Sequence, residues 1–462
     1  MRRYLLVAAV TAATATLTGS ASAGGTPAGA AATTRAAPGT RLWAARFRAG
    51  DRDFISYTMA MSPAGGRVFV TGDSYGGRAT GVDYATVAYS AATGRRLWVS
   101  RYSGPGKNED DPYAVAVSPS GRRVFVTGDS YGGRATGVDY ATVAYSAATG
   151  RRLWVSRYNG PASGDDLTSA VAVSPGGAAV FVTGSSDDPT TGDDYATVAY
   201  SAATGRRLWV RHYNGPAKKD DEASGVAVSP GGGAVFVTGI SRGQTTGEDY
   251  ATVAYRAATG RRLWVRRYNR RPKGEDYGAA VAVSPGRATV FVTGVSNGDY
   301  ATVAYSVATG RQLWVRRYHG RANGDNAACC VAVSPAGGRV FVTGYSSRGL
   351  YRNDYATVAY SAATGKQLWV SRYHGTAATS VAVSPAGTTV YVTGVGYGLD
   401  YATVAYGAAA GRQLWVRRYH GPRSNDTACC VAVSPGGTTV FVSGYSYDTR
   451  SSIAYATVAY RG

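Results

Sequence analysis

Few residues in this 462-residue sequence could do chemistry, and most of those that could recur at regular spacing. The four cysteines form two adjacent pairs, Cys329-Cys330 and Cys429-Cys430. Adjacent cysteines can stay free and pack as small side chains. They can also form a vicinal disulfide, which is strained because consecutive Cα atoms lie only about 3.8 Å apart. Both interpretations stay open, and an oxidising compartment would favour the disulfides.

Three of the four histidines, His319, His374 and His420, occupy the same place in repeated copies of a Tyr-(Asn/His)-Gly motif. Histidines at equivalent positions suggest a zinc site, because imidazole nitrogen is a common zinc ligand. The fourth, His212, lies two residues before the Asn of the same motif. Whether the three meet depends on the elements that carry them.

Aspartates recur in two series. The first precedes an apolar segment that ends in Ser-Pro and consists of Asp111, Asp166, Asp221, Asp276 and Asp426; the second precedes copies of YATVAY and consists of Asp83, Asp139, Asp194, Asp249, Asp299, Asp354 and Asp400. Aspartate often accepts hydrogen bonds from nearby backbone amides at turns and strand starts. If the fold gathers these carboxylates around one opening, they would also suit Ca²⁺, which prefers several oxygen ligands, although no loop has EF-hand spacing. No Gly-x-Ser-x-Gly elbow opens a helix, and we predict no catalytic residue and no metal ligand.

These residues lie between copies of one element, typified by YATVAYSAATGRRLWVSRY at residues 84–102. Every tryptophan belongs to a copy of it: Trp43, Trp98, Trp154, Trp209, Trp264, Trp314, Trp369 and Trp415. Their separations of 55, 56, 55, 55, 50, 55 and 46 residues indicate a stacked or radial repeat architecture.

Each period contains four short segments: one ending in Ser-Pro, then VFVTG, YATVAY and RRLWV. They are rich in Val, Tyr, Thr and Phe and are bounded by turn formers, which is typical of strands. Four strands in each of eight periods predict an eight-bladed β-propeller of four-stranded antiparallel blades. The first period begins with its Trp strand and the last lacks one. We therefore expect residues 41–47 to close the ring by completing the blade of residues 427–460, which leaves no open edge.

The pattern AYSAATGRRLW resembles the tryptophan-docking repeat of PQQ-type quinoprotein propellers, and the whole period resembles bacterial SBBP-type propeller repeats. The resemblance covers residues 41–460. It implies the fold, whereas such propellers have many functions. Quinoproteins of that family carry a vicinal disulfide against the cofactor and stack the cofactor on a tryptophan. Here all eight tryptophans belong to the docking repeat, and the family's calcium ligands and catalytic Asp have no counterpart that we can place.

The predicted architecture separates the candidate residues. The three histidines would follow outermost strands at a radius of roughly 20 Å, so neighbours would stand about 15 Å apart. Zinc–nitrogen bonds of about 2.0–2.1 Å cannot span that distance, and we expect surface turn residues. The cysteine pairs would lie on the sixth and eighth inner strands, about 11 Å apart, beyond the Cα range of about 4.4–6.8 Å for a disulfide. The blade between them has Thr376 where its neighbours have an acid or Asn326, and a shortened loop.

The N-terminus predicts export. Residues 1–23 have the basic start, apolar core and Ala-Ser-Ala end of a secretory signal peptide. Residues 24–40 are rich in Ala, Gly, Thr and Pro and are expected to be a disordered linker, followed by the propeller at 41–462. The apolar core is too short for a membrane span.

The net charge of +21 comes almost entirely from arginine. Arginines at turns and on outer strands keep sheet edges from pairing with other chains. They would also attract anionic polymers of a cell envelope. We expect a secreted, monomeric binding or scaffold module whose ligand face is formed by the acidic variable loops. Its partner would be such a polymer or an extracellular protein rather than nucleic acid, and no cofactor is expected. The alternative is a quinoprotein-like oxidoreductase or a metal-dependent lactonase-type enzyme that uses the channel mouth.

Overall fold

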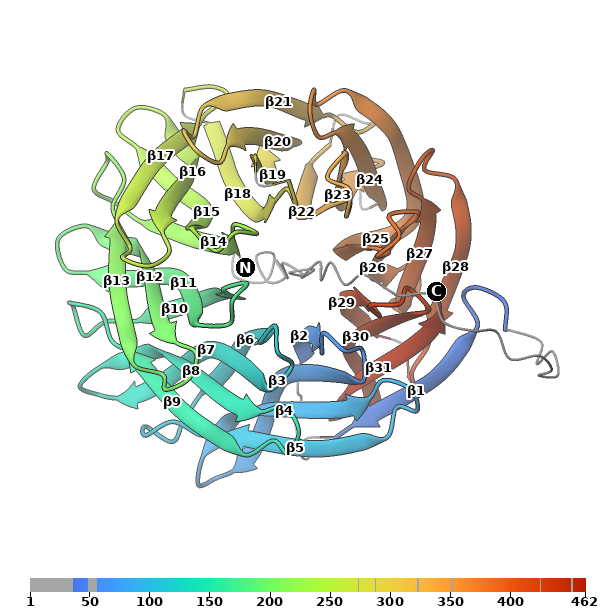
Figure 1. The fold of residues 1–462 in the computed structure, drawn as a ribbon, viewed down its shortest axis with the longest axis horizontal. Helices are drawn as coiled ribbons and strands as arrows, with labels where there is room; N and C mark the ends of the chain where they lie inside the picture. The colour runs from blue at the N-terminus through green and yellow to red at the C-terminus, as the bar shows by residue number, and fades with distance from the viewer. Residues whose placement is uncertain are drawn as a thin grey trace, which may run out of the picture.

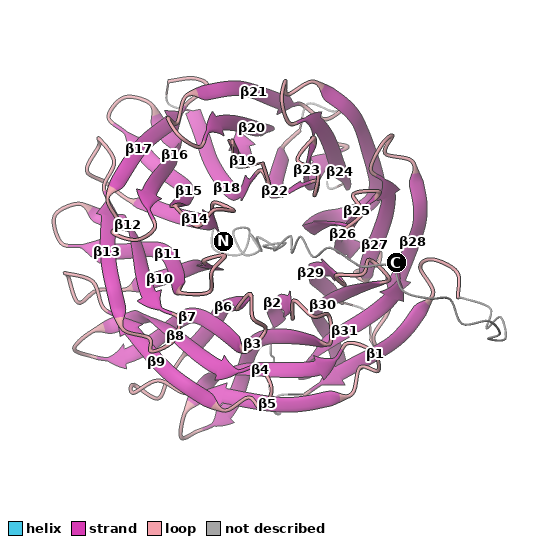
Figure 2. Ribbon diagram, in the orientation of Figure 1, coloured by secondary structure: helices cyan, strands magenta, loops and turns pink. Residues whose placement is uncertain are grey.

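The computed structural model describes residues 36–48, 56–272, 274–286, 288–321, 324–349, 352–423, 425–449 and 452–462. The predicted signal peptide (residues 1–23) and residues 24–35 of the predicted linker lie outside these ranges. All regular elements of the described residues are strands (Figure 2). This part of the chain accordingly has no helix with the length and apolar character needed to cross a membrane.

The strands form four-stranded antiparallel blades, and each blade runs along the chain from its innermost to its outermost strand, except that the outermost strand of the last blade comes from the N-terminal end of the described chain. The innermost strands are β2 (Ser56–Met61), β6 (Asp110–Val117), β10 (Asp166–Val173), β14 (Asp221–Val228), β18 (Gly274–Val283), β22 (Asn326–Val333) and β29 (Thr427–Val433). The second strands are β3 (Arg67–Gly77), β7 (Arg123–Gly133), β11 (Ala179–Asp188), β15 (Ala234–Gly243), β19 (Thr289–Ser296), β23 (Arg339–Ser347), β26 (Thr389–Gly396) and β30 (Thr439–Thr449).

The third strands contain the YATVAY segments: β4 (Gly81–Ser90), β8 (Gly137–Ser146), β12 (Gly192–Ser201), β16 (Gly247–Arg256), β20 (Asp299–Ser306), β24 (Asn353–Ser361), β27 (Tyr401–Gly407) and β31 (Ser452–Arg461). The outermost strands contain the tryptophans: β1 (Arg41–Phe47), β5 (Arg96–Tyr102), β9 (Arg152–Tyr158), β13 (Arg207–Tyr213), β17 (Arg262–Tyr268), β21 (Gln312–Tyr318) and β28 (Gln413–Tyr419). Strand β25 (Gln367–Val383) is outermost in one blade and innermost in the next, because the loop that separates these strands elsewhere is shortened here.

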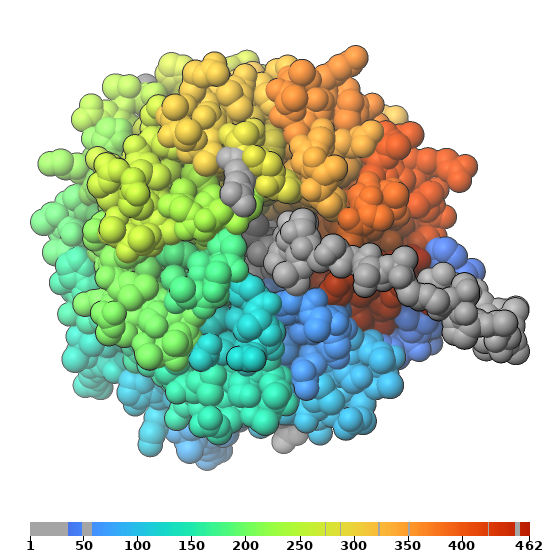
Figure 3. All heavy atoms as spheres, in the orientation of Figure 1, coloured from blue at the N-terminus to red at the C-terminus, as the bar shows by residue number. Residues whose placement is uncertain are grey.

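The blades follow one another around a central axis, so the chain is a β-propeller. The innermost strands lie nearest the axis and the tryptophan strands form the circumference (Figure 1). On the face shown in Figure 3 the colours follow one another around the ring in chain order. The core lies between neighbouring blades rather than on the axis, since each buried cluster combines residues of adjacent blades. The Val, Thr, Ala and Tyr side chains of YATVAY are buried on both strand faces, as stacked blades require.

The tryptophan repeat holds adjacent blades together. The indole N–H of seven tryptophans donates to a backbone carbonyl oxygen of the following blade at 2.9–3.2 Å. Each ring also lies against the glycine of the Ala-Thr-Gly turn in that blade, a turn that reads Ala-Ala-Gly at residues 409–411. Gly150, for example, has φ of +74°, and a Cβ added there would lie 2.7 Å from Trp98 Cδ2. Only glycine combines this left-handed backbone with so close a contact.

A second interblade contact uses the first tyrosine of YATVAY. Its hydroxyl donates to the carbonyl oxygen of the following blade's third strand at 3.1–3.4 Å, as in Tyr84 to Ala141 and Tyr250 to Ala301. Burial raises the pKa of Tyr84 and Tyr250 well above the ordinary value, so both stay protonated donors.

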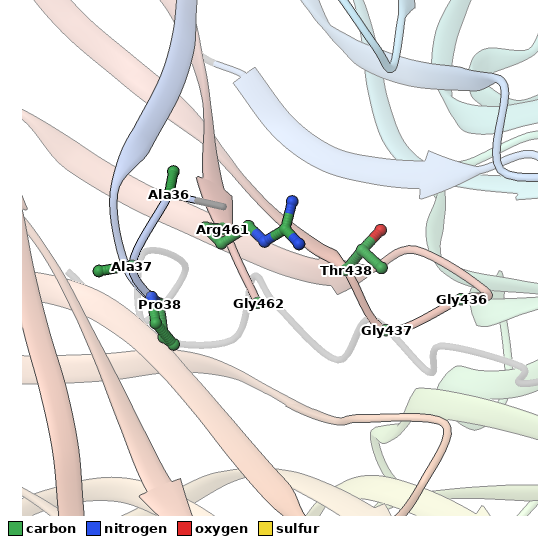
Figure 4. A pocket seen from close by; sticks show the side chains of 8 residues that line it. All are labelled: Ala36, Ala37, Pro38, Gly436, Gly437, Thr438, Arg461 and Gly462. Carbon is green, nitrogen blue, oxygen red and sulfur yellow. The ribbon is translucent and has the colours of Figure 1, made fainter. Parts of the chain in front are cut away.

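The N-terminal and C-terminal ends of the described chain meet in one blade. Strand β1 pairs with β31, with Arg41 opposite Tyr460 and Phe47 opposite Tyr455. The Gly39 N–H donates to the Arg461 carbonyl oxygen at 2.8 Å, as Gly94 does to Ser90 at 2.8 Å inside an unbroken turn. Figure 4 shows the pocket at this joint, lined by Ala37, Pro38 and Arg461 among others. The expectation of disorder to residue 40 was therefore wrong for residues 36–40, because they supply the turn that the last blade lacks.

Candidate functional site: the loop end of the ring

Antiparallel blades place two kinds of connection at opposite ends of the ring. We call the end with the long second-to-third and outer-to-inner connections the loop end, and the end with the Ser-Pro and Ala-Thr-Gly turns the turn end. The loops differ among blades while the turns are nearly constant, and variable loops on a constant scaffold commonly carry binding. All Asp and Glu residues that the structure describes lie towards the loop end. The loop end is therefore the candidate site.

The aspartates of the first series that lie at the start of innermost strands are buried and have a structural role. Asp166, Asp221, Asp276 and Asp426 are at most 1% exposed. Each accepts a hydrogen bond from a backbone N–H in the preceding loop, as Asp166 does from Gly160 at 2.6 Å and Asp426 does from Gly421 at 2.7 Å. Burial raises the pKa of Asp166 to about 6. These carboxyls close the loop onto the innermost strand and cannot meet a ligand directly.

The assignment of Asp111 to this series was wrong, and Asp110 is the equivalent residue. Asp110 pairs with Ser130 across β6 and β7, as Asp166 pairs with Ser186 across β10 and β11. Asp110 is also fully buried and accepts from the Gly104 N–H at 2.7 Å. Two consecutive acids at 110 and 111 made the register ambiguous, and counting back from the aligned alanines would have resolved it.

The exposed acids lie one residue earlier and were missed. Each buried residue of the series follows an exposed one, and the exposed acids are Glu109, Asp165, Asp220, Glu275 and Asp325. The signal was present in the sequence as acidic doublets such as Glu-Asp and Asp-Asp. The first carboxylate of each doublet points to solvent because the second is committed to the strand start. A partner at the loop end would meet these five.

The second aspartate series anchors arginines between blades. Arg157 Nη2 lies 2.5 Å from Asp139 Oδ2, while its Nη1 donates to the Tyr102 hydroxyl of the preceding blade at 3.1 Å. Arg267 makes the equivalent contacts with Asp249, at 2.6 Å, and with Tyr213 of the preceding blade. His212 takes the arginine's place in its own blade, with Nε2 2.8 Å from the Tyr158 hydroxyl. These polar side chains therefore connect adjacent blades of the ring.

The three histidines stay apart, each beside the aspartate of its own blade. Nδ1 of His319 lies 2.6 Å from Asp299, and Nδ1 of His374 lies 3.0 Å from Asp354. Nε2 of His420 lies 3.2 Å from Asp400. Their side chains are about 60% exposed, as expected of surface turn residues. Among the residues that the structure describes, no group of three or more His, Cys, Asp or Glu side chains could hold a metal ion.

Each adjacent cysteine pair is joined in a disulfide on an innermost strand, Cys329–Cys330 on β22 and Cys429–Cys430 on β29. Sγ of Cys330 lies 3.1 Å from the Thr379 carbonyl oxygen on the neighbouring strand β25. A disulfide sulfur has no proton, so this is a packing contact. Thr379 in turn donates to the Ala428 carbonyl oxygen at 2.8 Å. The two disulfides therefore flank one threonine across three consecutive innermost strands.

Asp111 provides a test of the electrostatics at this end. Burial raises its pKa to about 6, and a hydrogen bond with Asp73 partly offsets this. Because the folded pKa exceeds the ordinary value, protonation stabilises the fold, and that stability is lost as the pH rises through about 6. We expect Asp111→Asn, which imitates the protonated acid, to raise stability at pH 7.5 by up to about 3 kcal/mol, because the pKa lies roughly 2 pH units above its ordinary value and each unit corresponds to about 1.4 kcal/mol.

Thermal melts at pH 4.5 and 7.5 check this expectation. The variant should melt higher than the wild type at pH 7.5, and the difference should be clearly smaller at pH 4.5, where the folded wild type keeps most of its proton while the unfolded chain has lost part of it. Glu109→Gln, which removes an exposed carboxyl two residues away, is the matched control and should change neither melt. A lower melting temperature for Asp111→Asn at pH 7.5 would show that the charged carboxylate stabilises the fold through its hydrogen bond with Asp73.

The described residues do not fit a quinone cofactor in the way the resemblance implies. The indole rings of all eight tryptophans lie in interblade joints, with Trp415 against Gly39, so none is left to stack on a quinone. The carboxylates nearest the innermost strands are committed to backbone amides. The paired disulfides are the feature that the resemblance shares with this structure.

Comparison with known proteins gives a family. The family model described as outer membrane protein assembly factor BamB matches residues 7–215, 139–288 and 249–459. No curated protein matches the chain.

Solved structures give the fold alone. The quinohemoprotein alcohol dehydrogenase of Comamonas testosteroni is similar at a TM-score of 0.57 and 13% identity, over 90% of this chain and 76% of that chain. The hydrazine synthase of Kuenenia stuttgartiensis gives a TM-score of 0.48 and 16% identity, over 72% of this chain and 92% of that chain.

Proposed function

Since the chain belongs to the PQQ-like propeller family described by the outer membrane protein assembly factor BamB, we propose that it is an exported binding propeller. Its loop end binds a protein partner, and the rest of the ring is a rigid support. The family supplies the architecture, and the partner is argued from the loop end itself.

The observation that carries this proposal is the set of five exposed acids, Glu109, Asp165, Asp220, Glu275 and Asp325. They recur at one position in five blades, on loops whose buried neighbours are held by backbone hydrogen bonds. A row of fixed carboxylates on an otherwise strongly cationic protein is complementary to a basic surface. The partner is accordingly an extracellular protein with a basic patch.

Export is part of the proposal and rests on residues 1–23, whose basic start, apolar core and Ala-Ser-Ala end are those of a signal peptide. Expression of the full chain should give an exported product whose N-terminus begins at residue 24. A product that keeps Met1 in the cell would contradict this part of the proposal.

The binding test measures how much partner protein the exported chain captures, and compares the wild type with a variant whose exposed loop-end carboxylates are neutralised. Glu109→Gln, Asp165→Asn, Asp220→Asn, Glu275→Gln and Asp325→Asn together should reduce capture of the exported partner at least tenfold. The control neutralises five exposed cations of the turn end: Arg151, Arg206, Arg261, Arg311 and Arg412, each to Gln. It should retain capture. Equal retention by both variants would overturn the loop end as the binding face.

A second candidate function is a quinoprotein-like oxidoreductase, favoured by the two vicinal disulfides on innermost strands. Purified protein supplied with PQQ and calcium would distinguish the two by its absorption spectrum and metal content. A stoichiometric quinone signal would establish the oxidoreductase. One tightly bound Ca²⁺ without quinone would instead support a metal-dependent lactonase-type hydrolase.

A further inference from the structure

The turn end of the ring is cationic without compensation. Its Ala-Thr-Gly turns carry paired exposed arginines, such as Arg151-Arg152, Arg206-Arg207 and Arg261-Arg262. In the part of the chain that the structure describes, every ion pair lies at the loop end, and no Asp or Glu lies among these turns. The positive charge of the turn end is therefore available to an external anion.

The same turns expose a leucine. Among the described residues, the exposed large apolar side chains number eight, and six of them are the leucine that immediately precedes a tryptophan: Leu42, Leu208, Leu263, Leu313, Leu368 and Leu414. Their exposed fractions run from 36% to 46%. An exposed leucine and exposed cations therefore recur together, in successive copies of the turn, around the circumference.

Edge protection accounts for the arginines but not for the leucines. Charged side chains on an outermost strand prevent pairing with another chain. An exposed leucine beside them would weaken that protection, and a polar residue would serve better. Two copies, Leu97 and Leu153, are part of interblade clusters, whereas the other six leave a large apolar surface in water. The repeated exposure needs another explanation.

The turns are held rigidly. The glycine of each Ala-Thr-Gly turn lies against the tryptophan of the preceding blade. Serine or arginine two residues after that tryptophan binds the same turn, as Ser156 does with the Gly205 carbonyl oxygen at 2.6 Å and Arg266 does with Gly310 at 2.9 Å. The cation and leucine of one turn are thereby presented in a fixed relation to those of the next. Many weak contacts on one rigid ring add up when they bind a common surface.

We propose that the turn end docks on an anionic phospholipid surface. The arginine pairs bind lipid phosphates, and the leucines enter the boundary between headgroups and acyl chains. A soluble polyanion would be met by the arginines alone, whereas an anionic bilayer matches both the charge and the exposed apolar groups. The protein would then lie on a membrane with its loop end facing away from it.

The test is flotation of the purified full chain with vesicles. At 0.1 M salt the protein should float with vesicles of phosphatidylglycerol and phosphatidylcholine in equal parts, and should stay behind with phosphatidylcholine alone. A variant with Arg151, Arg152, Arg206, Arg207, Arg261 and Arg262 changed to Gln should bind at least tenfold more weakly.

The control removes six exposed cations of the loop end instead: Arg78, Lys107, Arg134, Lys218, Lys219 and Arg423, each to Gln. Both variants fall from a net charge of +21 by six, to +15, so a difference between them reports position and not net charge. The control should lose less than half of the binding. An equal loss in both variants, or no flotation of the wild type, would overturn the proposal.

Leucine variants distinguish binding to an anionic lipid surface from binding to a soluble polyanion. Changing Leu208, Leu263 and Leu313 to Ser should weaken vesicle binding several-fold and leave binding to dextran sulfate unchanged. These side chains are exposed, and an unchanged melting temperature shows that the fold is intact. Vesicle binding equal to that of the wild type would show recognition of polyanions only and would overturn the lipid assignment. Because the proposal concerns the turn end, its failure would leave the loop-end binding test unaffected.

Discussion

Replacing Trp264 by alanine is expected to lower the free energy of unfolding by about 3–5 kcal/mol, the range for removing a large buried aromatic side chain. Trp264 is 7% exposed and lies in the cluster between the β14–β17 and β18–β21 blades. Its ring centroid is 5.7 Å from that of Phe236 and 6.1 Å from that of Tyr305. Its N–H donates to the Val307 carbonyl oxygen at 3.0 Å, so the variant also leaves an acceptor without its partner.

Urea unfolding followed by circular dichroism measures this loss. Leu263→Ala is the matched control, because Leu263 is the adjacent residue on the same strand and is 36% exposed. We expect its effect to stay near or below about 1 kcal/mol, as for surface substitutions. An unchanged midpoint for Trp264→Ala would show that the indole does not hold adjacent blades together.

Removal of residues 36–47 is expected to have a still larger effect and to make the protein associate. The segment supplies β1, including Phe47 at 4% exposure, and the turn that covers Trp415. Its loss would expose the hydrogen-bonding edge of β31, and unpaired edges are templates for pairing with other chains. Burial of the segment's two large aromatic side chains, Trp43 and Phe47, alone contributes several kcal/mol, so we expect the free energy of unfolding to fall by at least about 5 kcal/mol. Size-exclusion chromatography and thermal melting would show both effects.

The matched control moves the segment instead of deleting it. Residues 37–48 placed directly after Gly462 would read Arg-Gly-Ala-Pro-Gly-Thr at the join, which parallels Ser-Ala-Ala-Thr-Gly-Arg at residues 90–95. The hydrogen bonds of the two turns already correspond, so the rearranged chain should melt close to the wild type. Failure of this chain to fold would show that residues 36–47 act other than as the missing strand of the last blade.

The repeat made the β-propeller predictable, because the physical requirement of each strand is copied with its sequence. The YATVAY segments, and the Val-Ala-Val segments of the innermost strands after the first, specify buried strands, and the Trp-Gly spacing specifies how blades meet. What the repeat could not specify was register at the loop end. The doublet Asp110-Asp111 offered two alignments, and only the strand pairing distinguishes them.

The candidate site was predicted as a region and not as residues. Sequence identifies an acidic, variable loop end, but burial decides which carboxylate of a doublet points to solvent. Asp166 is 1% exposed while its neighbour Asp165 is exposed, although both are aspartates and the sequence alone does not distinguish them. Likewise, adjacent cysteines are equally compatible with thiols and with the disulfide that the structure has. Both outcomes depend on local backbone direction, which composition does not encode.

The pairing of β1 with β31 also constrains the order in which the protein can fold. Most contacts in a blade join residues fewer than about 60 positions apart, whereas Phe47 meets Tyr455 across almost the whole chain. Long-range closure carries a large loss of chain entropy and slows folding. Blades can therefore form one after another while the polypeptide is still being made, but the ring cannot close until the last strand has been delivered. Until then β1 has no partner strand, and we expect the interval before closure to be the stage most sensitive to misassembly.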